Sequence, residues 1–145
     1  MVSRRAKCLW RMAAGVAILL TFGQAVWGAP VIVVNRDNPL SELTMAEVRQ
    51  MFLGRTMAWS DGVLVEPVVQ RGEIQDVFVG HFLGKSRQQY TIYWKKQLFT
   101  GKGLPPPELP DDRGVRSFVS RQRGAIGYID EQAVDGTVKR IIVTE

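Results

Sequence analysis

Apolar residues gather in several short runs along the 145-residue chain, and their spacing predicts which segments form strands. The run at residues 31–34 contains only valine and isoleucine, without the polar alternation of a half-exposed strand. We therefore expect this run to be a strand buried on both faces. Three further runs, at residues 63–69, 124–129 and 138–143, are also expected to be strands.

The first predicted helix has a complete start signal. Thr44 can act as its N-cap, and Glu47, three residues later, completes a capping box. The expected inward face follows at helical spacing and consists of Val48, Met51 and Phe52. Gly54 supplies the left-handed residue that commonly ends a helix.

Two further helices are expected on either side of Gly84, which ends the first of them. Residues 74–83 form that helix. Its expected inward face consists of Ile74, Val77, Phe78 and Phe82. Ser86 and Gln89 form the capping box of the next helix. The expected buried stripe of that helix consists of Tyr90, Tyr93, Trp94 and Leu98.

A fourth helix is expected after a Gly- and Pro-rich loop at residues 100–110, where three consecutive prolines exclude a helix. Asp111 or Asp112 can cap this helix. Its expected inward residues are Val115, Phe118 and Val119. Strands separated by helices indicate an α/β fold: a single layered domain with a largely parallel sheet flanked by helices.

Residues 1–28 have the layout of a secretory signal peptide. They carry four basic residues and no acidic one, and residues 12–22 form an apolar run that ends before the small residues at Gly28 and Ala29. That run is too short for a membrane-spanning helix, which needs roughly 20 residues. We expect cleavage after Gly28; cleavage after Ala25 and an uncleaved anchor, suggested by Trp27 beside the cut, remain alternatives.

Removal of the signal peptide changes what the charge of +5 means. Residues 29–145 hold 15 basic and 14 acidic residues, a net charge of +1, which gives no electrostatic case for binding nucleic acid. The only cysteine, Cys8, precedes the apolar run, so the exported domain is expected to have no disulfide and no thiolate metal site. The expected domains are a signal peptide at 1–28 and one binding domain at 29–145, with no stable membrane insertion after cleavage.

The residues of the chain give little support to catalysis. The one histidine, His81, lies in a predicted helix without a second histidine or a cysteine to form a metal cluster, and we expect it to be partly exposed. The acidic pair Asp111-Asp112 is explained by helix capping. No serine or threonine is spaced with a base in the manner of a nucleophile. The protein is therefore expected not to be an enzyme, with no metal and no cofactor.

One segment, residues 68–73, has the character of an anion site. A predicted strand ends there and a helix begins, and the free N–H groups of a helix start favour anions. Arg71 adds a two-pronged donor. An equally supported interpretation is that Arg71 pairs with Glu73, Asp76 or another surface acid.

Motifs in six places keep their order and spacing across nearly the whole of residues 29–145. They are Val-Val-Asn-x-x-Asn-Pro at 33–39, Leu-Thr at 43–44 leading to Met-Phe-Leu-Gly at 51–54, Trp-x-Asp-Gly at 59–62, Tyr-Trp at 93–94, Phe-x-Gly at 99–101 and Gly-Ala-Ile-Gly-Tyr at 124–128. Together they resemble the phosphate-binding proteins of ABC transporters, especially short, exported, single-domain members. The resemblance implies one lobe of a type II periplasmic-binding-protein fold and a periplasmic location.

Proteins of this family clasp phosphate between two lobes, one of which supplies an arginine followed by a Ser-Gly-Thr turn at a helix start. Arg71 matches that arginine, whereas residues 72–77 contain no such turn and carry Glu73 and Asp76. The resemblance implies a ligand site with Arg71 as the main donor, assisted by Gln70 and the amide of Gly72.

The expected function is that of an exported, solute-binding-like module related to the phosphate-binding components of ABC transporters. It would bind phosphate or a similar small anion weakly, or with the help of a partner such as an ABC permease or another envelope protein. The alternative is an envelope protein–protein adaptor that keeps the fold but has lost ligand binding.

Overall fold

The computed structural model describes residues 28–145, so almost all of the predicted signal peptide and Cys8 lie outside the described residues. The first half of the described chain contains β1 (Pro30–Val34), β2 (Glu42–Thr44), α1 (Met45–Phe52), β3 (Glu66–Pro67), β4 (Val69–Gln70) and α2 (Glu73–Leu83). The second half contains α3 (Arg87–Phe99), β5 (Glu108–Leu109), α4 (Asp112–Arg121), β6 (Ala125–Asp130), the 3-10 turn η1 (Glu131–Ala133), β7 (Lys139–Arg140) and β8 (Ile142–Thr144).

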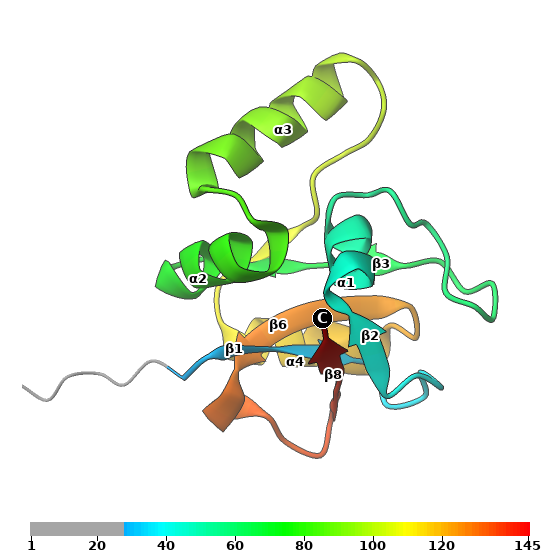
Figure 1. Ribbon diagram of the computed structural model, residues 1–145. Coiled ribbons are helices and arrows are strands. Elements are labelled where there is room, and N and C mark those ends of the chain that lie inside the picture. The colour runs from blue at the N-terminus through cyan, green and yellow to red at the C-terminus, as the bar shows by residue number, and fades with distance from the viewer. Residues whose placement is uncertain (1–27) are drawn as a thin grey trace, which may run out of the picture.

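The expected α/β fold, a sheet flanked by helices, is confirmed. The main sheet has the order β3-β6-β1-β7, with α4 packed on one face and α1 and α2 on the other. The helix α3 packs on α2 and projects away from the sheet (Figure 1).

The strand directions are more mixed than expected. The central strand β1 runs antiparallel to both of its neighbours, β6 and β7. Parallel pairing is confined to the short pairs β3–β6, β2–β8 and β4–β5. The largely parallel sheet was predicted from local strand–helix alternation, whereas the partners of β1 come from the far end of the chain and are not joined to it by a strand–helix–strand crossover.

The strand β1 is buried on both faces, as its unbroken β-branched sequence predicted. Ile32 and Val34 point into the larger apolar cluster, which includes residues of α1 and α2. Val31 and Val33 point into a second cluster formed mainly with α4. This alternation follows from the two-residue repeat of a strand and makes β1 the wall between the two cores.

The predicted helix starts are confirmed in atomic detail. In α1, Glu47 N donates to Thr44 Oγ1 over 3.2 Å, and Thr44 N donates back to Glu47 Oε2 over 2.7 Å. The start of α3 has the same reciprocal bonds between Ser86 and Gln89. Asp111, rather than its neighbour, caps α4 by accepting from the amide of Gly114.

Two predicted strands are interrupted in the structure. Residues 63–69 divide into β3 and β4 because consecutive amides turn to different partners: Val68 N donates to Ile126 O in the main sheet, and Val69 N donates to Pro107 O beside β5. Residues 138–143 likewise divide into β7 and β8. The chain thereby leaves the main sheet just before the segment that was predicted to bind an anion.

Two residues that were predicted to face inward are exposed, so the prediction is wrong for them. Val77 of α2 is 52% exposed and Leu98 of α3 is 54% exposed. The buried face of α2 is formed by residues 75, 78, 79, 82 and 83, and Val77 lies on the opposite side of that helix. Leu98 is exposed because α3 contacts the body of the protein mainly through α2, so no layer covers the far end of its stripe. Within residues 28–145, no helix has the length and apolarity that crossing a bilayer requires.

Candidate functional site

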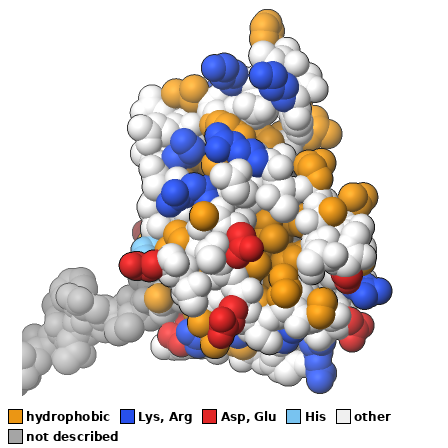
Figure 2. Space-filling view, turned by 45° about the vertical axis from the view of Figure 1, so that its right-hand side comes forward, with side chains coloured by type: hydrophobic (Ala, Val, Ile, Leu, Met, Phe, Trp, Pro, Cys, Tyr) orange, Lys and Arg blue, Asp and Glu red, His pale blue; other side chains and the backbone are white. Residues whose placement is uncertain are grey.

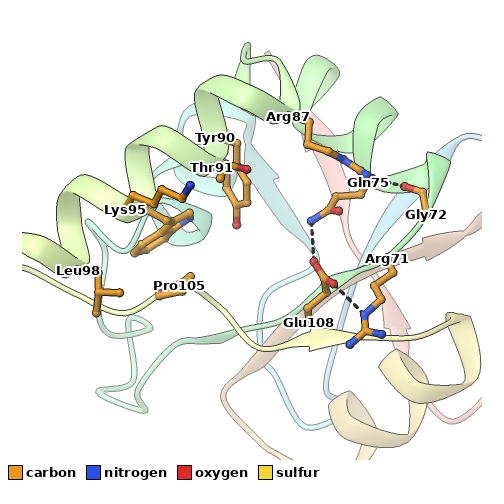
Figure 3. Close-up of a pocket in the computed structure, with 11 residues that line it drawn as sticks. Arg71, Gly72, Gln75, Arg87, Tyr90, Thr91, Lys95, Leu98, Pro105 and Glu108 are labelled. Carbon is orange, nitrogen blue, oxygen red and sulfur yellow. Dashed lines mark hydrogen bonds and ion pairs between the residues drawn. The ribbon is translucent and has the colours of Figure 1, made fainter.

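A pocket of about 450 Å³ lies between α3, the start of α2 and the segment around β5 (Figure 3). One face of α3 forms its longest wall, with Arg87, Tyr90, Thr91, Trp94, Lys95 and Leu98. Their spacing of three or four residues is that of one helical face. The start of α2 contributes Arg71, Gly72 and Gln75, and the loop and strand opposite contribute Pro105 and Glu108.

The start of α2 depends on Gly72, which precedes the first helical residue. Gly72 has φ of +97°, a conformation that side-chain-bearing residues rarely adopt, and no side chain caps the first turn. The first N–H groups of a helix have no partner within the helix, so this end presents donors to a ligand. Glu73 and Asp76 in the same turn weaken the attraction for an anion.

Arg71 is paired, but not with either acid that its local sequence suggested. Its Nε lies 2.8 Å from Glu108 Oε1, and Gln75 Nε2 donates to the other carboxylate oxygen of Glu108 over 3.4 Å. The Glu108 carboxylate thus occupies the position between Arg71 and α2 where a bound anion would be expected. Figure 3 shows the three side chains converging below α3.

Gln70, the third predicted site residue, is buried beneath the pocket and does not line it. Its side chain donates to Asp112 Oδ1 over 2.6 Å. Its backbone is held by Tyr128, whose hydroxyl accepts from Gln70 N over 3.0 Å and donates to Gln70 O over 2.9 Å. The structure therefore brings Arg71 and Gly72 together at the pocket and directs the Gln70 side chain toward α4.

Arg87 connects α3 to the start of α2. Its Nη2 donates to Gly72 O over 2.7 Å, and its Nε lies 2.7 Å from Asp76 Oδ1. Lys95, two turns further along the same face, makes no ion pair within the described part of the chain. Of the cations at the pocket, Lys95 is the one with its charge uncompensated by a close carboxylate.

Tyr90 and Trp94 form the buried floor of the pocket and are 7% and 6% exposed. Within residues 28–145, neither Tyr90 Oη nor Trp94 Nε1 has a hydrogen-bond partner of good geometry, although the Trp94 side chain lies close enough to the Tyr90 hydroxyl to act on it as a weak hydrogen-bond donor. Burial raises the pKa of Tyr90 to about 12, with Trp94 offsetting part of the rise, so the phenol keeps its proton at neutral pH. The Tyr90 hydroxyl points from α3 toward the loop that carries Pro105 and Glu108 (Figure 3).

Sequence reasoning assigned Tyr90 and Trp94 to the core and missed their polar ends. Both are buried as expected. The apolar periodicity that identified them is the same for a core residue and for a pocket floor. Only the three-dimensional structure shows that their donors lack acceptors, which is rare for buried polar groups.

Charge is unevenly distributed around this pocket. Residues 77–107 contain five basic residues and no acidic one, whereas the rest of 29–145 contains ten basic and 14 acidic residues, a net charge of −4. Figure 2 shows lysine and arginine side chains gathered on the part of the molecule that α3 forms, with acidic side chains below them. The wall of the pocket formed by α3 is therefore the positive part of an otherwise acidic domain.

The described residues offer no group for metal chemistry. No set of three or more His, Asp or Glu side chains is arranged to hold a metal ion in residues 28–145. His81 is exposed on α2, as expected, and lies beside Phe82 away from the pocket of Arg71.

No protein-family model matches the sequence, and no curated protein matches it. Solved structures do match. A putative phosphate ABC transporter substrate-binding protein with bound phosphate from Clostridium perfringens has a TM-score of 0.66 and 18% identity, over 82% of this chain and 47% of that chain. An ABC-type phosphate transport receptor from Vibrio cholerae has a TM-score of 0.57 and 19% identity, over 81% and 46%.

A possible phosphate binding protein from Planctomyces limnophilus is similar in the same way, with a TM-score of 0.56 and 14% identity over 81% of this chain and 42% of that chain. The chain spans about half the length of these proteins. The resemblance seen in the motifs is confirmed at the level of the fold: residues 28–145 have the architecture of about half of a phosphate ABC transporter substrate-binding protein.

Proposed function

We propose that this protein is an exported, periplasmic binding module, not an enzyme, that takes phosphate or a similar small anion weakly at the pocket of Arg71 and Gly72. The observation that carries the proposal is the pocket itself. Arg71, Arg87 and Lys95 line one cavity with the uncapped start of α2, in a fold shared with proteins described as phosphate-binding. An ABC permease or another envelope protein is the proposed partner.

Weak binding follows from the position of Glu108. Its carboxylate already accepts from Arg71 and Gln75, so an incoming anion must displace it or bind beside a like charge. The pocket is also open to water. Water in the site screens the attraction between the cations and the anion.

Calorimetric titration of phosphate into a chain of residues 29–145 tests the proposal. We expect a dissociation constant in the range of about 0.1 to 10 mM, and about tenfold weaker binding for Arg71→Ala because a charged donor is lost. Arg123→Ala is the matched control, since Arg123 forms an exposed ion pair with Asp61 (3.1 Å) and does not line the pocket. Absence of binding at phosphate concentrations several times above the upper end of this range would overturn the proposal.

Glu108→Gln tests the reason given for weak binding. Glutamine keeps the size of the side chain and removes the competing negative charge beside Arg71. We expect phosphate to bind about three- to tenfold more tightly to this variant at low salt, with a smaller gain at high salt. An unchanged affinity would show that Glu108 does not compete with the ligand.

The adaptor alternative is supported by exposed apolar residues at the end of α3 and in the loop that follows it. Phe99 is 94% exposed and Leu104 is 75% exposed, next to Leu98 at 54%. Monomeric proteins rarely leave adjoining large apolar side chains in water unless they contact another molecule. An adaptor would use this surface to hold another envelope protein.

Cross-linking in intact cells separates the two candidates. A photoreactive residue at position 99 would capture a specific envelope protein if the chain is an adaptor, and a Leu104→Ser change would reduce that capture. The same residue placed at exposed Asp37, remote in sequence from α3, serves as control. Capture at both positions, or at neither, would count against the adaptor.

A further inference from the structure

The pocket beside α3 is larger and more apolar than a phosphate ion requires. Its volume of about 450 Å³ falls within the 300–1,000 Å³ range of small-molecule sites. A phosphate ion has only five heavy atoms. The space beyond Lys95 is bounded by the indole of Trp94 and by Leu98 and Pro105, which have no polar side-chain group to offer an anion apart from the indole N–H.

The apolar part of this surface is itself incompletely covered. Leu98 is 54% exposed on the pocket face of α3, and Pro105 is exposed on the loop opposite. A ligand with an apolar group placed between these two side chains would remove their surface from water, which is favourable in proportion to the area covered.

The buried polar atoms of the floor specify the other end of the ligand. Tyr90 and Trp94 line the pocket, and their buried polar atoms, Oη and Nε1, have no well-aligned partner within residues 28–145. The Trp94 N–H only donates and interacts weakly with the Tyr90 oxygen, so the proton of the Tyr90 hydroxyl is the donor that calls for an acceptor atom. Lys95 and Arg87 stand on the same face of α3, one to seven residues from Tyr90 and Trp94 in sequence, and supply positive charge.

We propose that the pocket binds an amphipathic organic anion, a phosphate monoester or carboxylate that carries an apolar group, in preference to inorganic phosphate. Its acidic head lies near Lys95 and Arg87 and accepts from the Tyr90 hydroxyl, and its apolar group lies between Leu98 and Pro105. The inference rests on the proposed function, because it assigns a class of ligand to the same pocket.

A series of four probes tests it by calorimetry on residues 29–145: inorganic phosphate, methyl phosphate, phenyl phosphate and phenol. The first three keep a phosphate head and enlarge the apolar group, and phenol has the ring without the phosphate. We expect phenyl phosphate to bind about tenfold to hundredfold more tightly than inorganic phosphate, methyl phosphate to fall between them, and phenol not to bind measurably.

The outcomes separate this inference from the proposed function. Equal affinity for phosphate and phenyl phosphate contradicts the inference and leaves weak phosphate binding standing. Binding of neither contradicts both. Phenyl phosphate binding without phosphate binding supports the inference and contradicts the inorganic ligand. Phenol binding as tightly as phenyl phosphate contradicts the role of the acidic head.

Two pairs of variants identify the residues. Tyr90→Phe keeps the ring and removes the unpartnered donor, and we expect phenyl phosphate to bind about three- to tenfold more weakly. Its control is Tyr93→Phe, because Tyr93 Oη already donates to Leu53 O over 2.7 Å and does not line this pocket.

Lys95→Gln is compared with Lys96→Gln, which removes the adjacent exposed charge outside the pocket. We expect a loss of affinity for phenyl phosphate of about fivefold or more at position 95, and a much smaller loss at 96. Equal effects within each pair would overturn the site assignment. Because Lys95 is exposed, its variant tests the site even if Tyr90→Phe disturbs folding.

Discussion

Two buried tyrosines of the same apolar core differ in how their hydroxyls are used. Tyr128, in the central sheet, donates to Gln70 O and accepts from Gln70 N, so its hydroxyl closes a pair of backbone bonds. Tyr90, on α3, is buried to a similar degree and has no partner. The pKa of each is raised by burial. Similar burial thus serves two different purposes.

The difference separates a part of the core in which the buried tyrosine hydroxyl has hydrogen-bond partners from a part in which it does not. Tyr128 stacks on Phe78 with ring centroids 3.9 Å apart and fastens β4 to β6 from within a finished core. Tyr90 and Trp94 lie under the open pocket, and no atom of residues 28–145 accepts a well-aligned hydrogen bond from the Tyr90 hydroxyl. A buried donor without an acceptor is costly, and its retention at a cavity points to function more than to stability.

Alkaline pH is expected to have the largest effect on stability, and it acts on both tyrosines. Above pH 10 an unfolded chain loses phenol protons that the folded chain retains, because the folded pKa values are raised. Each phenol therefore costs about 1.4 kcal/mol of stability per pH unit from pH 10 to about 12. Denaturant unfolding at pH 9, 10 and 11 measures this slope.

Tyr90→Phe and Tyr128→Phe should each remove about half of that alkaline slope, since each deletes one of the two protons. If neither variant changes the slope, the loss of stability arises from other groups, and the raised pKa values of the two tyrosines are contradicted.

The next largest expected effect on stability comes from adding a side chain at Gly124, just before β6, where the backbone is closely packed. A Cβ on Gly124 would lie 1.9 Å from Leu64 O, a backbone atom that cannot move aside easily. We expect Gly124→Ala to destabilise the protein by about 3 kcal/mol. Gly136→Ala, where a Cβ meets nothing within 4 Å, is the control and should be nearly neutral. Similar melting temperatures for both variants would contradict the packing seen around β6.

Tyr128→Phe should destabilise the protein by about 2 kcal/mol at neutral pH, because it leaves a buried N–H and a buried C=O of Gln70 without partners. Because β4 leads into Arg71, this variant should also weaken phosphate binding. Thermal unfolding and calorimetry measure the two effects. A variant as stable as the parent would show that water satisfies Gln70 in place of the tyrosine.

The smallest expected effect on stability is that of Tyr90→Phe, and it sharpens the comparison most. It removes a buried hydroxyl without a partner, so we expect stability at neutral pH to be unchanged or raised by up to about 1 kcal/mol. Thermal unfolding without ligand measures it. A loss of more than about 1 kcal/mol would mean that the Tyr90 hydroxyl has a structural hydrogen-bond partner, as the Tyr128 hydroxyl does.

Local signals predicted the local structure well. The capping boxes of α1 and α3 and the double burial of β1 depend on residues close in sequence, and each is confirmed. The role of Arg71 was left open between a ligand and a surface acid, and the acid is Glu108, 37 residues away, instead of the nearby Glu73 or Asp76. That contact requires β4 and β5 to lie side by side, which no local pattern encodes.

By itself, the sequence determined where helices begin and end, which strand is buried on both faces, and that Arg71 stands at a strand-to-helix junction. These follow from hydrogen bonds and side-chain periodicity within a few residues. Only the tertiary structure decided the direction of β1 relative to its neighbours, the pairing of Arg71 with Glu108, and the contrast between Tyr128 and Tyr90. Each of these depends on whether a segment distant in sequence supplies the hydrogen-bonding or charged partner.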